Sequence, residues 1–236
     1  MEQSRRLSIL YNPVFRVTST LLWVLVGPLF VGVIILAVLR IDFTTAFAFY
    51  VEHRYIAVYV EIISAGLLPL LFSLICKDDL TLYGLRRKGL VSSVLLSALY
   101  VTSVYGLSFL STGHLIEFGT FSFHLKFPWT FWYAALGVFA YGPLEVFVVV
   151  WLITNTDRIF KGESSTISIG LIVTIIIWSL LHIISAGVGI GDALGVAFRF
   201  FFLGLIYKYT ENSIGPMIAW SLVNGIIFSY ALILLS

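Results

Sequence analysis

The most constraining feature of this sequence is a recurrence of apolar runs, each about 20 residues long, separated by short charged stretches. An α-helix of that length matches the thickness of the hydrocarbon core of a bilayer. The 236 residues are 60% hydrophobic and only 11% charged, against roughly 25% charged residues in soluble domains. A membrane-spanning β-barrel would instead alternate apolar and polar residues over segments of about ten. The sequence therefore predicts an all-α, polytopic integral membrane protein.

We expect about seven transmembrane helices in a single domain that comprises residues 1–236. The predicted spans are 17–39, 55–76, 90–111, 129–154, 166–187, 193–208 and 214–235. The first run is too long for the core of a signal peptide, and no small-residue cleavage site follows it. We therefore interpret it as a retained helix.

The distribution of Lys and Arg predicts which ends of these spans face the cytoplasm. If the N-terminus is cytoplasmic, that side carries ten of the 14 basic residues: Arg5, Arg6, Arg16, Lys77, Arg86, Arg87, Lys88, Arg158, Lys161 and Lys208. The opposite side carries Arg40, Arg54 and Lys126, and Arg199 lies within a span. This bias predicts a cell-membrane protein with a cytoplasmic N-terminus and, with seven spans, a C-terminus outside.

The sequence does not indicate a metal, a cofactor or a nucleic acid as ligand. Cys76 is the only cysteine, which excludes an intrachain disulfide and a cysteine-ligated metal site. His114 and His124 lie ten residues apart in a predicted outer loop rich in aromatic residues, a composition typical of the membrane interface. The net charge of +2 is too small to indicate nucleic-acid binding.

Four polar side chains within the last four predicted spans point to a functional site. They are Glu145, His182, Arg199 and Asn224, one in each span, whereas the N-terminal spans carry only Glu61 as a comparable group. Inserting an ionisable side chain at mid-membrane costs at least about 2.5–3.5 kcal/mol of free energy, so each one is expected to have a structural or functional role. Ordinary structural roles remain open, namely interhelical hydrogen bonds or an ion pair of Glu145 with Arg199 or His182. Because the four side chains occur in four consecutive spans, we expect them to form one site.

Glu145 follows the pair Gly142-Pro143 within its span. Proline has no N–H to donate and its ring crowds the preceding turn, so we expect the helix to kink there. Such breaks persist at membrane depth only where protein or water satisfies the freed backbone groups. A carboxylate beside the break predicts a hydrated cavity in which Glu145 acts as a general base, with His182 within hydrogen-bond reach directly or through one water.

The polar residues resemble the motifs of a family of intramembrane endopeptidases, the CAAX prenyl protease and bacteriocin-processing family, also called the abortive-infection family. That family shows Glu-Glu-x-x-x-Arg on one helix, Phe-x-x-x-His on the next and His-x-x-x-Asn (or Asp) on the last. Glu145 matches the first glutamate, Trp178 to His182 fits the second motif with Trp in place of Phe, and Trp220 to Asn224 occupies the third. The steps of 37 and 38 residues between Glu145, His182 and Trp220 are also similar to those of the family.

Two further stretches extend this resemblance. Residues 202–216 look like the family's approach to its last motif, and Tyr83-Gly84-Leu85-Arg86-Arg87-Lys88 resembles a junction that often precedes the family's core. The similarity covers roughly residues 80–230. It implies an endopeptidase that needs no metal and cleaves a membrane-delivered peptide, with the lipid bilayer and a membrane-associated peptide or protein as its partners.

The resemblance also implies roles for single residues. Glu145 and His182 would activate a water, and Asn224 would donate one hydrogen bond to the oxyanion. Trp178 and Trp220 would support the site or bind substrate, and Trp220 could itself donate through its indole N–H. Arg199 is a further supporting residue, to which the motifs give no catalytic role.

The sequence departs from the family at three positions. Val146 replaces the second glutamate, Val150 the arginine and Trp220 the first histidine of the last motif. Two alternatives therefore stay open beside the peptidase. One is a pseudoenzyme that binds a membrane peptide or partner without cleaving it. The other is a small transporter or lipid-handling protein with Glu145 as a proton relay, although no inverted repeat is present.

Overall fold

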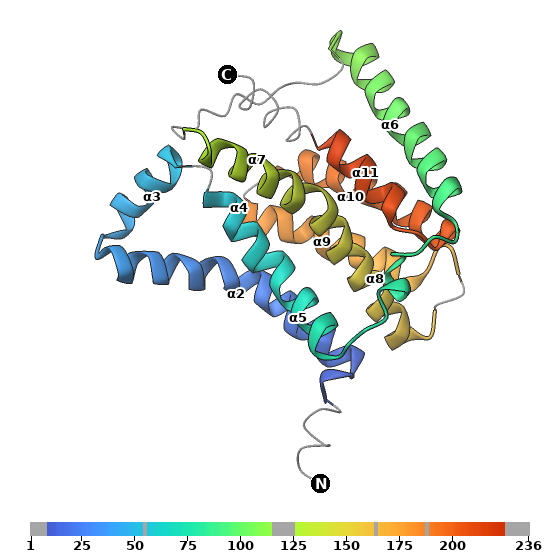
Figure 1. Cartoon of the computed structure of the whole chain (residues 1–236), viewed down its shortest axis with the longest axis horizontal. Coiled ribbons are helices and arrows are strands. Elements are labelled where there is room, and N and C mark those ends of the chain that lie inside the picture. The colour runs from blue at the N-terminus through green and yellow to red at the C-terminus, as the bar shows by residue number, and fades with distance from the viewer. Residues whose placement is uncertain (1–8, 54–55, 115–125, 163–164, 187–188, 225–236) are drawn as a thin grey trace.

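The computed structural model describes residues 9–53, 56–114, 126–162, 165–186 and 189–224, and these residues form helices and connecting turns without a strand (Figure 1). The α-helices are α2 (Pro13–Leu39), α3 (Phe43–Glu52), α4 (Ile56–Glu61), α5 (Leu67–Ile75), α6 (Leu90–Thr112), α7 (Trp129–Phe139), α8 (Glu145–Phe160), α9 (Ile169–Ala186), α10 (Ile190–Thr210) and α11 (Ile214–Val223). Two π-helical segments, η1 (Ile62–Gly66) and η3 (Ala140–Leu144), and a 3₁₀ turn, η2 (Leu80–Tyr83), complete the chain.

Five helical stretches of the described residues are long and apolar enough to cross a membrane. They are Pro13–Leu39, Ile56–Ile75, Leu90–Thr112, Trp129–Phe160 and Ile190–Thr210, and each coincides with a predicted span. The other two predicted spans correspond to the shorter apolar helices α9 and α11. The last of them continues into residues 225–236, outside the described residues. The fold is that of an all-helical, polytopic membrane protein, and the number of seven spans stays a prediction.

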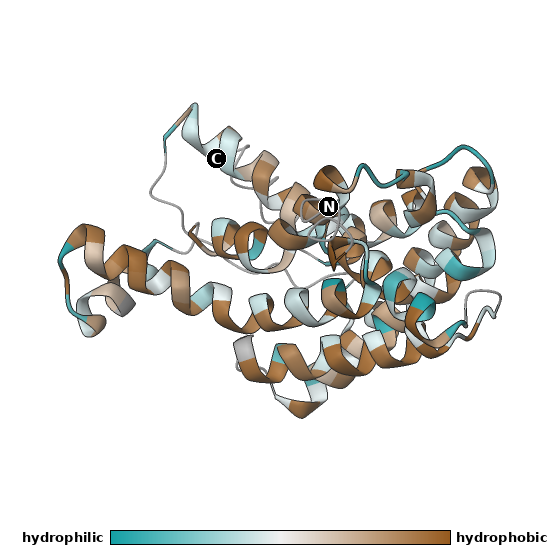
Figure 2. Ribbon diagram, turned by 90° about the horizontal axis from the view of Figure 1, so that it is seen from below, coloured by the Kyte–Doolittle hydropathy of each residue, from teal (hydrophilic) through white to brown (hydrophobic). Residues whose placement is uncertain are grey.

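The outer surface of the helices is apolar, as a lipid environment requires. Leucines on α2, α5 and α6 are largely exposed, for example Leu29 at 70%, Leu74 at 72% and Leu110 at 82%. Figure 2 shows hydrophobic residues along the outward faces of the helices. In water such a surface would be a large exposed apolar patch of the kind that marks membrane contact.

Helix α8 is the centre of the molecule. Twelve of its 16 residues are buried, and it contacts α2, α9, α10 and α11. Figure 1 shows α7 and α8 running between α4–α5 on one side and α11 on the other. The predicted span ended at residue 154, but the helix continues to Phe160 because Asn155 and Asp157 find polar partners inside the protein.

The expected break at Pro143 takes the form of a π-helical segment rather than a sharp kink. Segment η3 lies between α7 and α8 without interrupting the helical path from Trp129 to Phe160. A wider π-helical turn leaves space for the proline ring and displaces the backbone bonds that an α-helix would make. A second π-helical segment, η1, contacts η3 from the neighbouring helix.

Small residues allow the broken segments to approach their neighbours closely. A Cβ atom at Gly142 of η3 would collide with Ser221 of α11, and one at Gly66 of η1 would collide with Leu144 of η3. Both positions therefore require glycine for the observed packing. As a result Glu145, directly after η3, is held close to α11 and to the helix that contains η1.

One helix was not predicted. Residues 43–52 lie in a gap between two expected spans but form α3, which begins after Asp42. The Asp42 carboxylate accepts the backbone N–H of Thr45 at 2.9 Å, so it caps the N-terminus of this helix.

Candidate functional site

Glu145 is the first residue of α8 and lies directly after the π-helical break. Only 5% of the residue is exposed, so a protein environment, not solvent, surrounds its carboxylate. A carboxylate in such a position needs hydrogen-bond donors or a cation to compensate for the loss of hydration. The structure provides these groups from α9 and α11.

Trp220 of α11 donates its indole Nε1–H to Glu145 Oε2 at a distance of 2.7 Å. The indole is itself buried, with 3% of the residue exposed, and it packs against Phe200 of α10 with ring centroids 4.5 Å apart. The predicted supporting role of Trp220 thus takes a definite form. Its N–H binds the carboxylate directly, in the place where the resemblance implies a histidine.

His182 of α9 approaches the other carboxylate oxygen. Its Nε2 lies 3.8 Å from Glu145 Oε1, and 25% of the histidine side chain is exposed against 6% of the glutamate side chain. The opposite ring nitrogen, Nδ1, lies 2.9 Å from the backbone carbonyl oxygen of Trp178. A carbonyl only accepts, so Nδ1 carries a proton and donates it to Trp178, and Nε2 faces Glu145.

The distance of 3.8 Å between Glu145 Oε1 and His182 Nε2 is too long for a direct hydrogen bond. One water about 2.8 Å from each atom would bridge Oε1 and Nε2. A carboxylate that accepts a hydrogen bond from such a water polarises it. The pair has the geometry of a general base and its partner.

Trp178 contributes a second indole to the same place. The residue is 3% exposed, and its Nε1–H interacts with the Glu145 carboxylate as a donor but does not reach hydrogen-bond geometry with any described residue. The ring also contacts His182, with centroids 5.6 Å apart. A buried donor without a partner is costly, and here it adjoins the Glu145–His182 pair.

The side chain of Asn224, at the end of α11, binds the π-helical segment η3 and not the Glu145 carboxylate. Its Nδ2 donates to the backbone carbonyl of Tyr141 in η3 at 2.8 Å. This bond satisfies a backbone group at the π-helical break, as a break at membrane depth requires. The interhelical hydrogen bond considered for Asn224 is therefore present.

Arg199 does not join the cluster. It is exposed on α10 and forms no ion pair with Glu145. The buried side of α10 carries Phe200 and Leu203, and a step of one residue along a helix turns the side chain by about 100°. Of the two ion pairs that the sequence leaves open for Glu145, the structure therefore does not form the one with Arg199.

The structure adds Glu61, to which the sequence assigned no role. Glu61 ends α4 immediately before η1, is partly buried, and lies within electrostatic range of Glu145. Its position inside a predicted span was the available signal, since every ionisable residue at membrane depth requires a reason.

Within the described residues, no three His, Cys, Asp or Glu side chains form a cluster that could hold a metal ion. His114 lies near the end of α6, where its backbone carbonyl accepts a hydrogen bond from Ser108 at 3.0 Å. His124 falls outside the described residues. Comparisons with protein-family models, with curated proteins and with solved structures found no match to this chain.

Proposed function

We propose that this protein is an intramembrane endopeptidase of the glutamate type, similar to the CAAX prenyl protease and bacteriocin-processing family, acting on a membrane-delivered peptide. The observation that carries the proposal is the 3.8 Å approach of Glu145 Oε1 to Nε2 of His182, whose Nδ1 lies at hydrogen-bond distance from the Trp178 carbonyl. The two groups lie beside a π-helical break, a feature frequent at functional sites.

The chemistry proposed is hydrolysis of one peptide bond by one water. Glu145 and His182 hold the water and accept its proton as its oxygen attacks the carbonyl carbon. The tetrahedral intermediate then collapses, and the same pair returns the proton to the leaving amine. No metal ion or cofactor enters these steps.

The oxyanion of the intermediate needs a donor, and Trp178 supports the proposal here. Its indole N–H is buried, close to Glu145 and without a hydrogen-bond partner among the described residues. A preorganised donor of this kind is worth about 10²–10³ in rate in a well-studied protease. We assign this role to Trp178 because the amide of Asn224 is bound to the Tyr141 carbonyl.

A pseudoenzyme is the second candidate, and one observation favours it. The Trp220 indole occupies Oε2 of Glu145 at 2.7 Å, so one lone pair of the proposed base is already used. Together with Val146 and Val150 in place of the charged residues of the first motif, this bond is consistent with a site that binds a peptide without cleaving it.

Cleavage and stability measured on the same samples separate the two candidates. The protein is reconstituted in vesicles with fluorogenic peptides anchored by a prenyl or an acyl chain. For a peptidase, Glu145→Gln abolishes cleavage because glutamine keeps the shape and loses the base, and His182→Ala does the same. Asp192→Asn is the control, since this carboxylate is exposed at the start of α10, and it leaves cleavage unchanged.

Two results would count against the peptidase. Processing that continues unchanged in Glu145→Gln excludes the glutamate mechanism. If the folded wild-type protein binds these peptides saturably and cleaves none of them, the pseudoenzyme is the correct candidate. Trp220→His, which restores the family's residue, adds a second test: a peptidase retains or gains turnover from it, whereas a pseudoenzyme stays without turnover.

A further inference from the structure

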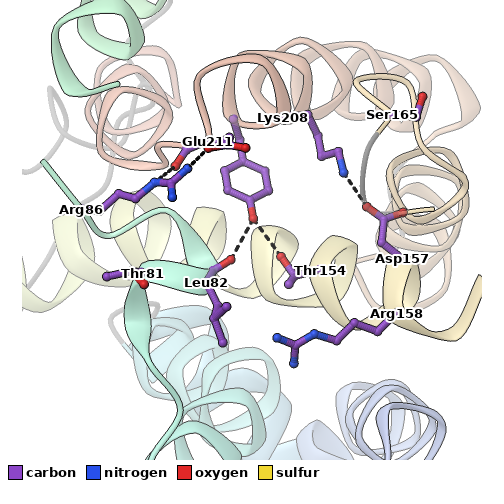
Figure 3. Close-up of a pocket in the computed structure, with 10 residues that line it drawn as sticks. Thr81, Leu82, Arg86, Thr154, Asp157, Arg158, Ser165, Lys208 and Glu211 are labelled. Atoms are coloured by element: carbon purple, nitrogen blue, oxygen red, sulfur yellow. Dashed lines mark hydrogen bonds and ion pairs between the residues drawn. The ribbon is translucent and has the colours of Figure 1, made fainter. Parts of the chain in front are cut away.

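A polar cavity of about 290 Å³ lies at the end of the bundle where α8 and α10 terminate (Figure 3). It is remote from Glu145. Arg158 in the cavity wall lies thirteen positions after Glu145 on α8, which corresponds to about 20 Å along the helix. We refer to this cavity as the interfacial pocket, because it opens at the side of the molecule that carries most of the Lys and Arg residues.

The wall of the interfacial pocket carries three cationic side chains, Arg86, Arg158 and Lys208, and two carboxylates, Asp157 and Glu211. Figure 3 shows them arranged around one space, with Arg158 reaching from α8 towards Leu82. Among the described residues of the wall, positive charges therefore exceed negative charges by one.

Both carboxylates are already bound within the protein. Lys208 Nζ lies 2.8 Å from Asp157 Oδ2, and the other oxygen of Asp157 accepts the backbone N–H of Gly170 at 2.8 Å. Glu211 forms an ion pair with Arg86. The hydrogen bond and the charge of Arg86 lower the pKa of Glu211, so this carboxyl stays ionised and paired. The two carboxylates of the pocket are therefore not available to bind an added cation.

Hydroxyl groups complete the wall and exposed apolar residues adjoin it. Thr81, Thr154 and Ser165 line the cavity. In the chain next to the lining residues, Leu80 is 46% and Phe160 51% exposed. A basic pocket between helix ends at the cytoplasmic surface, beside apolar surface, is the setting in which lipid phosphates are bound.

We propose that the interfacial pocket binds a phosphate group, supplied by an anionic lipid headgroup or by a soluble phosphate ester. Guanidinium groups match the geometry of phosphate oxygens and hold them through charge-assisted hydrogen bonds. The proposal rests on the residues of the pocket alone and is independent of any activity at Glu145.

Binding is measured by calorimetry on the full chain in neutral detergent, with three probes below their micellar concentrations: dihexanoyl phosphatidic acid, dihexanoyl phosphatidylcholine and glycerol 3-phosphate. We expect saturable binding of phosphatidic acid. Arg158→Gln weakens it about tenfold, the effect of losing one charge-assisted contact. Arg87→Gln removes the same charge from an exposed position outside the pocket and leaves the affinity within about twofold.

A second pair of variants covers the case in which Arg158→Gln fails to fold. Thr81 lines the pocket and is exposed, so Thr81→Glu brings a carboxylate to the pocket at little cost to the fold. It weakens phosphate binding, whereas Thr81→Gln, of equal size and no charge, does not.

The three probes identify the source of the phosphate. Binding of phosphatidic acid alone assigns the site to a lipid headgroup, and equally tight binding of glycerol 3-phosphate assigns it to a soluble ester. The proposal is overturned if no probe containing an anionic phosphate binds saturably. It is also overturned if Arg87→Gln weakens binding as much as Arg158→Gln, since attraction is then a property of the whole charged surface.

Discussion

The two oxygens of the Glu145 carboxylate face different partners. Oε2 accepts a hydrogen bond from Trp220, whereas Oε1 lies 3.8 Å from Nε2 of His182. The first contact is a direct hydrogen bond that holds the side chain in place, and the second is too long for one. The two contacts can be separated by mutation.

Trp220→Phe tests the structural contact. Phenylalanine keeps an aromatic ring against Phe200 but removes the N–H, which leaves one oxygen of a buried carboxylate without its donor. We expect a loss of about 1–3 kcal/mol in the free energy of unfolding, measured by denaturant titration in mixed micelles.

Trp178→Phe is the matched control, because Trp178 is equally buried but its N–H has no partner among the described residues. It therefore costs less stability than Trp220→Phe. Equal losses in the two variants would contradict the hydrogen bond to Glu145 as a source of stability. A large loss of turnover in Trp178→Phe with little loss of stability would support its role as oxyanion donor.

At the level of helices and segments, the site depends on how closely η3 packs against α11. Gly142 provides this approach, since a Cβ atom there would collide with the Ser221 side chain. Asn224 adds a hydrogen bond to the η3 backbone one turn further along the same helix. The π-helical break, its proline and the α11 surface therefore form one structural unit around Glu145.

Gly142→Ala is expected to destabilise the protein by about 1–3 kcal/mol, the usual cost of overpacking. Ser221→Ala removes the hydroxyl that lies closest and should recover much of this loss in the double variant. Gly106→Ala in α6 is the control, because a Cβ atom at this position would meet no neighbouring atom, and alanine is there neutral or stabilising. Thermal unfolding of the four variants measures these effects. Additive losses in the double variant would contradict the close approach.

Another contact between elements lies at the opposite end of α8. Arg16 of α2 is 2% exposed, and its guanidinium lies 5.6 Å from the ring centroid of Phe72 and 5.5 Å from that of Trp151. Its guanidinium pairs with Asp78 at 2.6 Å and donates to Asn155 at 3.3 Å. A residue that the sequence analysis assigned to the charged cytoplasmic surface is thus a buried link between α2, α8 and the segment after α5.

Arg16→Met is expected to cost about 3–5 kcal/mol, because it leaves the Asp78 carboxylate, whose side chain is 8% exposed, with the Tyr83 hydroxyl but without its cation. Arg86→Met breaks an ion pair in which 60% of the Glu211 side chain is exposed, so we expect a loss of only about 0–1 kcal/mol. The midpoints of denaturation of the two variants provide the comparison. Similar shifts would indicate that Arg16 is solvated in the native protein.

At the scale of the whole molecule, the sequence was most informative where length and hydropathy decide the structure. The span predicted for 90–111 is a helix over Leu90–Thr112, because a continuous apolar run between glycines leaves few alternatives. Helix α3 was missed because its ten residues are too few for a span. The extension of α8 was missed because its last polar residues find partners only in the folded protein.

Part of the candidate site could also be predicted, because an ionisable side chain in an apolar span is costly and therefore conspicuous in the sequence. The cost of burial singles out Glu145 and His182, and the structure places their side chains 3.8 Å apart. Arg199 is singled out in the same way but lies on the exposed side of α10, because the sequence of a helix that is apolar on every side does not show which side faces the protein. The proximity of Glu61 to Glu145 depends on the packing of separate helices, which the sequence alone does not show.

The last prediction concerns the orientation of the whole molecule in the membrane. The bias of ten basic residues against three predicts that the end of the bundle with Arg158 and Lys208 faces the cytoplasm. Single cysteines at Arg87, Lys161, Arg40 and Lys126, all exposed positions, are introduced after Cys76→Ala. With an impermeant maleimide added to intact cells, Arg40→Cys and Lys126→Cys should react, and Arg87→Cys and Lys161→Cys should react only after the membrane is opened. Each side of the membrane is probed at two positions, so that one cysteine that is locally inaccessible to the maleimide does not decide the result. Reaction of all four from the same side would exclude this topology, and a reversed pattern would place the interfacial pocket, and any phosphate that it binds, on the outer surface.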